Sequence, residues 1–513
     1  MSQTHEASEK ASSKESLDLY QIEVQVLPRD TESHDENNYS DADYARVLRK
    51  VDRILLPLMW ICYGIQQADK TSLANQAIFG IRSDTQLKGQ QYQWLTTIFY
   101  ITFLVGELPS NFLLQRFPMG RMLTIYMFCF GGCVLLVSIA QNFTHLLVLR
   151  ALQGFFQCTI SPGFVLLTAT FYTVSEHSSR ALFWQSANAG FGILFDLCSY
   201  GIALYAQKHP GGLAPWRGIS VFLGSITILC AIVCFFLLGT PKEVRWLSRE
   251  EKNMVNARVV KNKAGRDTTG IKWNWQQVNE ALTDPQCYFY VCNAFLACVP
   301  NGGLSTFGNI LSTSFGFTEL QVLLVGIPRS IASLLLFLAV GIYTARVRNR
   351  RLWIMAAALV PPFAGFLALS LLPNEPRYKW VKWGLYFMNV PFVLTLFMGW
   401  TLITSNVAGR TKKTIISSAT FLGYCLGNIV GSQIFKTADA PHYIPGIITC
   451  SICFGLNFLL VLAWRSYYVK ENARRDAVLT RSGLSVDTQE ETGRRLGEMD
   501  VTDSENLYFR YTL

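Results

Sequence analysis

The stretch ILLPLMWICYGIQQADKTSLANQAI, residues 54–78, decides the fold class. Its length and apolar start are those of a helix that crosses a lipid bilayer, which needs about 20 predominantly apolar residues. Asp69 and Lys70 nevertheless stand side by side within it. Each charge at the centre of such a helix costs about 2.5–3.5 kcal/mol, so charged residues there face the interior of a helix bundle. The stretch therefore predicts a membrane protein with a polar interior.

Composition supports this class. The chain has 513 residues, of which 50% are hydrophobic and 16% charged, whereas soluble domains carry about 25% charged residues. All 13 cysteines lie in or at the edges of apolar runs, which predicts buried free thiols rather than a disulfide framework. The formal net charge of +10 is scattered through short loops, so we expect no nucleic-acid partner.

Windows of about 20 apolar residues predict twelve spans in an all-α polytopic membrane protein. The first and the tenth spans are the least uniformly apolar, because polar residues interrupt them. A long loop at 241–284 separates two blocks of six, which is the plan of a secondary transporter. The predicted spans are residues 54–78, 92–114, 120–140, 144–168, 182–205, 218–239, 286–309, 320–343, 352–372, 382–404, 413–435 and 444–465.

Basic residues predict the orientation. Lys and Arg concentrate in the connections that share a side with both termini, including RVRNRR at 346–351 and GRTKK at 409–413, so both termini are predicted to be cytoplasmic. The glycosylation acceptor at Asn142 then falls outside, close to the membrane, and the plasma membrane is the expected location. The expected parts are a disordered N-tail at 1–45, a first half at 46–240, the cytoplasmic loop at 241–284, a second half at 285–470 and a polar, disordered C-tail at 471–513.

Two spans carry polar stripes at helical spacing. In the first span, Gln66 and Lys70 share a face with Tyr63 and Gln67, and Asp69 lies beside it. The pair of charges either contacts an ion or substrate in an aqueous cavity or only neutralises itself and fixes packing. In the fourth span the stripe is Arg150, Gln153, Gly154, Gln157 and Ser161. Because arginine keeps its proton, Arg150 needs either an anionic ligand or a structural salt bridge.

Three carboxylates are predicted at membrane depth: Asp69, Glu107 and Asp196. Desolvation favours their protonated form, so one of them could carry a proton while the others pair with Lys70 or Arg150. Arg329 is the charge well inside a span of the second half and is the first candidate to hold a substrate carboxylate. Alternatively, the side chain of Arg329 extends to the membrane interface and contacts water there.

Glycine and asparagine mark the seventh and eleventh spans. Gly423, Gly427 and Gly431 recur every four residues, which predicts close helix packing, and Asn428 within that run could line a cavity. The seventh span contains PNGGLSTF at 300–307, with Asn301, and this sequence predicts a broken helix beside a cavity.

Catalytic and cofactor motifs are absent from the sequence. It has no GxxxxGK[ST] phosphate loop, no HExxH, no serine elbow and no Cys/His metal set, and its six histidines are scattered. We therefore expect neither an enzyme nor a bound cofactor or metal.

Several motifs resemble a known family. RALQG at 150–154 is similar to the fourth-helix signature of the major facilitator superfamily. SNFLLQRFPMGR at 110–121 resembles its loop 2–3 signature, with Gln115 in place of the usual Asp, and GIYTARVRNRR at 341–351 resembles the degenerate second copy. The segments ADKTSL, PSNFLLQRFP, WRG, LSREEKNMVNARV, PNGGLSTFG, SNVAGRTKK, GNIVGSQIF and DVTDSENLYFRYTL resemble the fungal allantoate permease branch of the anion:cation symporters.

The resemblance implies a monomeric, proton-coupled carrier of a small organic anion such as allantoate, nicotinate or pantothenate, working by alternating access. Lys70, Arg150 and Arg329 would be the cationic contacts. The expected hydrogen-bonding groups are Gln66, Gln157, Asn301 and Asn428, and the expected gating residues are Arg116, Gly120, Arg121, Arg346 and Arg350. The alternatives are an exporter of a specialised metabolite from a biosynthetic gene cluster and a non-transporting nutrient sensor.

Overall fold

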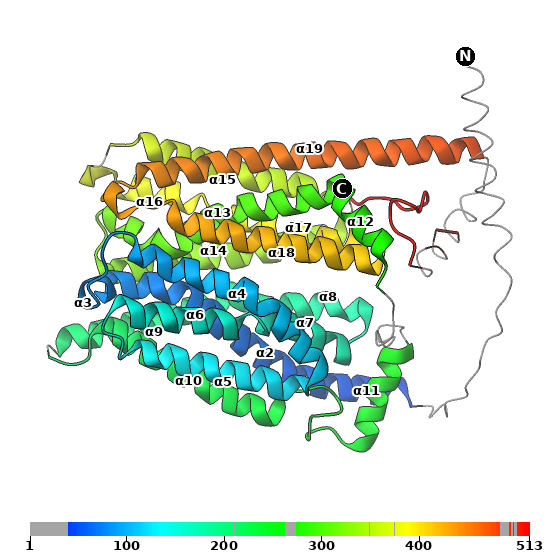
Figure 1. The fold of residues 1–513 in the computed structure, drawn as a ribbon, viewed down its shortest axis with the longest axis horizontal. Helices are drawn as coiled ribbons and strands as arrows, with labels where there is room; N and C mark the ends of the chain where they lie inside the picture. Colours follow the sequence, from blue (N-terminus) through cyan, green and yellow to red (C-terminus); the bar gives the residue numbers. More distant parts are fainter. Residues whose placement is uncertain are drawn as a thin grey trace, which may run out of the picture. The chain divides into compact units, whose positions relative to one another are not determined.

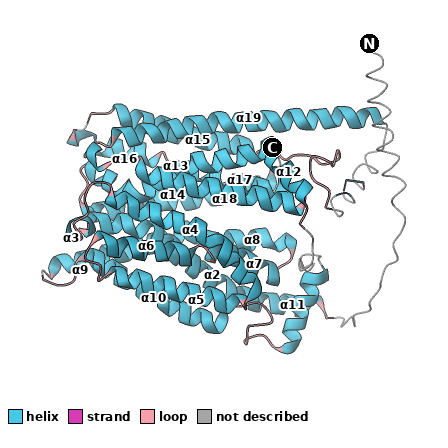
Figure 2. Ribbon diagram, in the orientation of Figure 1, coloured by secondary structure: helices cyan, strands magenta, loops and turns pink. Residues whose placement is uncertain are grey.

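A computed structural model describes residues 39–209, 211–261, 273–347, 349–373, 375–482, 492–493, 496 and 500–513. Within these residues the regular structure is helical, without a strand (Figures 1 and 2). Residues 1–38, most of the predicted N-tail, lie outside the described residues.

The first block contains six helical spans, two of which consist of two helices each. A break at Cys158–Thr159 divides the fourth span. Pro162 favours this break, because its ring clashes with the carbonyl four residues earlier and it has no N–H to donate. The helices are α2 (Asp41–Ile78), α4 (Gln91–Arg116), α5 (Met119–Val137), α6 with α7 (Phe143–Gln157 and Ile160–Phe171), α8 with α9 (Val174–Gln185 and Ala187–Lys208) and α10 (Pro215–Leu237); the short α3 (Ile81–Asp84) follows α2.

The second block repeats this plan. Its tenth span is divided before Pro391, where α16 ends at Phe387, again four residues before a proline. The helices are α13 (Pro285–Ser314), α14 (Glu319–Arg346), α15 (Arg351–Leu371), α16 with α17 (Lys379–Phe387 and Val393–Asn406), α18 (Arg410–Gln433) and α19 (Ile444–Ser482). Between the blocks, the predicted loop contains α11 (Arg249–Lys261) and α12 (Trp275–Thr283).

Ten of these spans are apolar enough to cross a membrane on length and hydropathy alone. The two others are α2 and α13, which have 38 and 30 residues but carry too many polar groups. The first span was expected to be interrupted by polar residues. The expectation for the tenth span was wrong. The tenth span, formed by α16 and α17, is long and apolar enough to cross a membrane, whereas the seventh span, α13, is not apolar enough.

Helix packing shows the repetition of the two blocks. The third span packs on the sixth in both, as α5 on α10 and α15 on α19. The blocks meet through α4 against α18 and through α9 against α14. In each case the second span of one block therefore contacts the fifth span of the other, as expected for two halves related by an approximate twofold axis.

We name the two ends of the bundle by their contents. The tail end holds α11, α12 and residues 500–513, and the far end holds α3 and the turn between α18 and α19 (Figure 1). The prediction of a disordered C-tail is wrong for the described part, because α19 continues to Ser482 and residues 500–513 pack against the bundle. The partners of this segment come from other parts of the chain, so its polar composition did not reveal them.

Small residues permit the closest helix contact. A Cβ atom on Gly431 would lie 2.1 Å from the Val299 carbonyl oxygen, and one on Gly427 would lie 2.6 Å from that of Phe295. These contacts confirm the packing interpretation of the glycines in α18. The predicted helix break in α13 is wrong, because the helix continues through Pro300 and Gly302 packs against the Asn428 backbone instead of opening the chain.

Candidate functional site

A buried ion pair lies inside the first half. Arg150 Nη1 on α6 is 3.5 Å from Asp69 Oδ2 on α2, and their side chains are 7% and 1% exposed. Gln157 donates to the same carboxylate oxygen at 2.8 Å, and Gln153 accepts from Arg150 at 2.8 Å. Asp69 and Arg150 are 81 residues apart in sequence, so the polar stripes of two spans meet face to face.

Some hydrogen-bonding atoms around this ion pair have no partner. Arg150 Nε and Gln157 Oε1 are buried and make no hydrogen bond within the described residues. Asp69, Gln76 and Arg150 also line a cavity of about 10 Å³, which is roughly the space of one water molecule. Gln66 binds the Gln157 carbonyl at 3.1 Å and completes the contact of α2 with α6. Buried polar atoms without partners are costly, so a water molecule that hydrogen-bonds to them would stabilise this network.

Lys70 lies at the junction of the halves. Its side chain is half-buried, and its ammonium is 5.2 Å from the centre of the Phe103 ring. Phe103 in turn stacks on Phe421 of α18 in the other half. Within the described residues Lys70 forms no ion pair, so the neighbouring Asp69, which pairs with Arg150, does not neutralise it directly.

A second polar cluster connects the halves. Asn75 donates to Asp196 at 3.1 Å and accepts from Asn309 of α13 at 2.6 Å. Arg329 of α14 is close enough to act electrostatically on Asp196. Arg329 also donates to the Tyr386 hydroxyl at 2.7 Å.

The cavity beside this cluster is small. It is lined by Asn309, Ser312, Arg329 and Tyr386 together with mainly apolar residues, and its volume is about 10 Å³. Arg329 lies ten residues after the start of α14, about 15 Å along the helix. This depth disfavours the alternative that Arg329 reaches to the membrane interface.

The remaining predicted site residues lie apart from these clusters. Asn301 donates to Asn428 at 2.9 Å, which connects α13 with α18 within the second half. Glu107 is partly buried beside Asn111, one turn further along α4. Gly120 at the start of α5 donates its N–H to Glu243 at 2.9 Å, and a Cβ atom there would lie 2.3 Å from the Leu238 carbonyl oxygen. The other predicted gating residues are exposed: Arg116, Arg121, Arg346 and Arg350.

Hydrogen bonds between the halves gather at the far end. Thr97 of α4 bonds to Ser432 at 2.8 Å and accepts from Gln433 at 2.7 Å. Tyr92 donates to the Thr306 carbonyl of α13 at 2.8 Å. Gln93, Thr96, Thr306 and Thr437 add further bonds across the same boundary, and we call these eight residues the far-end belt. The belt joins the first two turns of α4 to Thr306 of α13, to the end of α18 and to Thr437 just after it.

Three buried thiols also come together, on α2 and α10. Cys62 Sγ lies 3.4 Å from both Cys230 Sγ and Cys234 Sγ, and the three sulfur atoms are within 4.8 Å of one another. Sequence reasoning predicted no such set, because Cys62 and Cys230 are 168 residues apart. The prediction of free thiols agrees with the structure, in which all 13 cysteines are free and ten are buried. Cys198 and Cys292 are exposed.

Sequence reasoning missed several polar residues that connect the halves. Asn75 and Asn309 bridge α2 to α13, and Tyr386 is the partner of Arg329. Asn75 could have been found, since it follows Asp69 and Ser72 at three-residue steps along the first span. Tyr386 and the far-end belt carry no such local signal, because their partners lie on distant helices.

A bundle of twelve spans in two six-span blocks, with ionic groups at the junction, defines a membrane transporter. Family comparison agrees, since the Major Facilitator Superfamily model matches residues 59–432. The chain belongs to this superfamily and is a multi-pass membrane protein, not an enzyme.

Individual relatives confirm the predicted branch. The chain is 32% identical to an uncharacterized transporter of Schizosaccharomyces pombe, over 93% of this chain and 89% of that protein. It is 30% identical to the allantoate permease of Saccharomyces cerevisiae, over 90% and 86% of the two chains. A crystal structure of a bacterial homolog of the human lysosomal transporter Spinster superposes with a TM-score of 0.57 at 12% identity, covering 84% and 97% of the two chains, and shows the shared fold.

Proposed function

We propose that this chain is a proton-coupled secondary transporter that takes up a small organic anion by alternating access. The observation that carries the proposal is the state of two cations at the junction of the halves. Lys70 lies eight residues before the end of α2 and Arg329 ten residues after the start of α14. Both are half-buried and contact neutral aromatic groups, whereas Arg150 has a carboxylate partner. A cation at this depth without an ion pair attracts an anionic ligand. Lys70 and Arg329 are therefore our substrate contacts, and Arg150 is assigned to the Asp69 network.

Asp196 is our first candidate for the proton carrier. It lies at the junction of the halves, bonded to Asn75 and close to Arg329. An anion bound at Arg329 adds negative charge beside Asp196 and so favours its protonated form. Binding of the anion and of the proton then support each other. With one proton for each monoanion no net charge moves, and a pH unit supplies about 1.4 kcal/mol.

The far-end belt supports alternating access. It holds the halves together at one end, so a path to the junction from that side requires these hydrogen bonds to break. We assign the far end to the outside and the tail end to the cytoplasm, as the basic loops indicate. In this assignment the structure is closed toward the outside. The plasma membrane remains the proposed location.

The test is uptake of labelled substrates by cells that express the chain. Allantoate, nicotinate, pantothenate, biotin and a dipeptide are offered, with the organic cation thiamine as a contrast. We expect one carboxylate to accumulate at acidic external pH and a protonophore to abolish this accumulation. Accumulation of thiamine alone would refute the anion proposal, and efflux without uptake would refute the direction and favour the exporter.

Residue assignment is tested with Arg329→Gln. A hydrogen bond to a charged group contributes about 1.5–3 kcal/mol, so KM should rise about 10- to 150-fold. The control is Arg377→Gln, which removes an arginine that is exposed at the far end and paired with Glu375. Equal surface expression with normal uptake by Arg329→Gln would remove Arg329 from the site.

A further inference from the structure

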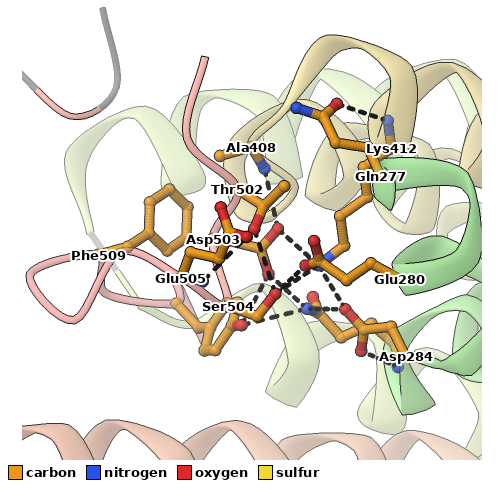
Figure 3. A network of polar contacts seen from close by, with 12 residues as sticks. Gln277, Glu280, Asp284, Ala408, Lys412, Thr502, Asp503, Ser504, Glu505 and Phe509 are labelled. Carbon is orange, nitrogen blue, oxygen red and sulfur yellow. Dashed lines mark hydrogen bonds and ion pairs between the residues drawn. The ribbon is translucent and has the colours of Figure 1, made fainter. Parts of the chain in front are cut away.

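The last 14 residues of the chain form an ordered segment at the tail end of the second half. Residues 500–513, which we call the C-terminal segment, contact side chains from α12, α13, α17, α18 and α19. Figure 3 shows the part of this contact around Asp503 and Lys412. The segment thus connects helix ends that are far apart in sequence.

Asp503 is the anchor of the C-terminal segment. It is fully buried, and its Oδ1 accepts from Lys412 at 3.0 Å and from the Ala408 N–H at 3.1 Å. Its Oδ2 accepts from Gln286 and from the Tyr511 hydroxyl, both at 2.8 Å. Burial, and then the charge of Asp503, raise the pKa of Tyr511, so this hydroxyl remains a donor. Four donors from three different parts of the chain converge on one carboxylate, which is how proteins bind an anion in their interior.

Lys412 connects the segment to two acidic residues of the bundle. Its side chain is completely buried and lies 2.6 Å from Asp284 and 2.9 Å from Glu280, in addition to Asp503. Ser504 also donates to Glu280 and accepts from Lys412 (Figure 3). Without the segment, Lys412 would keep Asp284 and Glu280 but lose the buried carboxylate of Asp503. Removal of a partner from a buried ionic network is destabilising.

Two asparagines hold the end of the segment by its backbone. Asn406 of α17 accepts from the Thr512 N–H and donates to the Thr512 carbonyl, both at 2.9 Å. Asn472 of α19 does the same for Tyr511, at 3.0 and 2.9 Å. Each amide thus replaces the backbone partner that a neighbouring strand would provide. Such bonds recognise an extended peptide, in the same way as a peptide-binding domain does.

We propose that the tail end of the second half is a binding site for an acidic peptide, and that residues 500–513 of the same chain are its resident ligand. Occupancy of this site clamps the ends of α12, α17, α18 and α19 together, so that this half moves as one body. The proposal is independent of the transported substrate. It also means that loss of uptake after C-terminal truncation reflects a lost clamp and does not indicate a signalling function.

Hydrogen–deuterium exchange on the full-length protein in nanodiscs tests the proposal. In the wild-type chain the amides of Tyr511 and Thr512 should exchange slowly, because both donate to buried or half-buried side chains. Asp503→Asn should accelerate their exchange on the order of 100-fold or more, since it breaks a buried ion pair. The control Glu505→Gln makes the same charge change at an exposed position two residues away and should leave exchange unchanged.

A milder variant covers the case in which Asp503→Asn does not fold. Asn472 is half-buried, and Asn472→Ala removes its two hydrogen bonds to the Tyr511 backbone. This variant should accelerate exchange at Tyr511 about 10-fold, with normal membrane insertion. Rapid exchange of residues 505–513 in the wild-type protein, at the rate of a free peptide, would overturn the proposal. So would equal acceleration by Glu505→Gln and Asp503→Asn, or no change in a folded Asn472→Ala protein.

Discussion

The far-end belt predicts how one hydroxyl sets the balance between the two access states. Thr97 is buried and bonds to both Ser432 and Gln433 of the opposite half. Thr97→Val keeps the shape of the side chain and removes only the hydroxyl. In the open state these partners would face water and recover their hydrogen bonds there, so the variant destabilises the closed state selectively.

The magnitude follows from the two lost bonds. Each intramolecular hydrogen bond contributes about 1 kcal/mol net, so the closed state loses about 2 kcal/mol. At about 1.4 kcal/mol per factor of ten, the ratio of far-end-open to far-end-closed molecules should rise about 30-fold. If the open state of the wild-type chain is a minor species of about 1%, roughly a quarter of the Thr97→Val molecules should be open.

Pulsed EPR distance measurements across the far end check this shift. Spin labels on unnatural amino acids at Gln141 and Glu375, exposed in loops of opposite halves, avoid the native cysteines. We expect a longer distance to gain population in Thr97→Val. The matched control is Thr168→Val, because Thr168 is fully buried and, within the residues that the structure describes, its hydroxyl bonds only to the Phe164 carbonyl of its own helix. A change of less than about threefold, or the same change in the control, would refute the gating role of the belt.

Two further predictions concern stability. Arg150→Gln leaves the buried Asp69 without its cation and should cost about 3–5 kcal/mol, while the double variant with Asp69→Asn should recover most of this loss because both charges are gone. Thermal unfolding in detergent compares them, and a double variant no more stable than the single one would contradict the ion-pair interpretation. Gly431→Ala would place a Cβ atom 2.1 Å from the Val299 carbonyl oxygen and should strongly reduce the yield of monodisperse protein, whereas Gly341→Ala meets no atom within 4 Å and should not. Equal yields from the two alanine variants would disprove the close packing of α13 on α18.

The class of protein followed from local properties of the chain. The summed hydropathy of about 20 consecutive residues decides whether a helix is stable in lipid. This sum depends on the sequence of the helix alone and not on the helices that pack against it. The twelve spans, the two blocks and the family were therefore predicted correctly. The break in the fourth span was not predicted, and a proline alone does not decide it, because α13 continues through Pro300 whereas the fourth span breaks four residues before Pro162.

The candidate site depends on pairings across the sequence. Asp69, Lys70 and Arg150 could all be recognised as intramembrane charges, but only their folded positions show that Asp69 pairs with Arg150 and that Lys70 turns toward the other half. The same is true of the C-terminal segment, whose polar sequence resembles a disordered tail until Lys412 supplies a partner 91 residues away. A polar side chain is stable in the interior only when its hydrogen bonds are satisfied, and the chain order does not state which distant group satisfies them. The sequence thus established that the protein spans a membrane and where its helices lie, and folding in three dimensions assigned the partner of each buried charge.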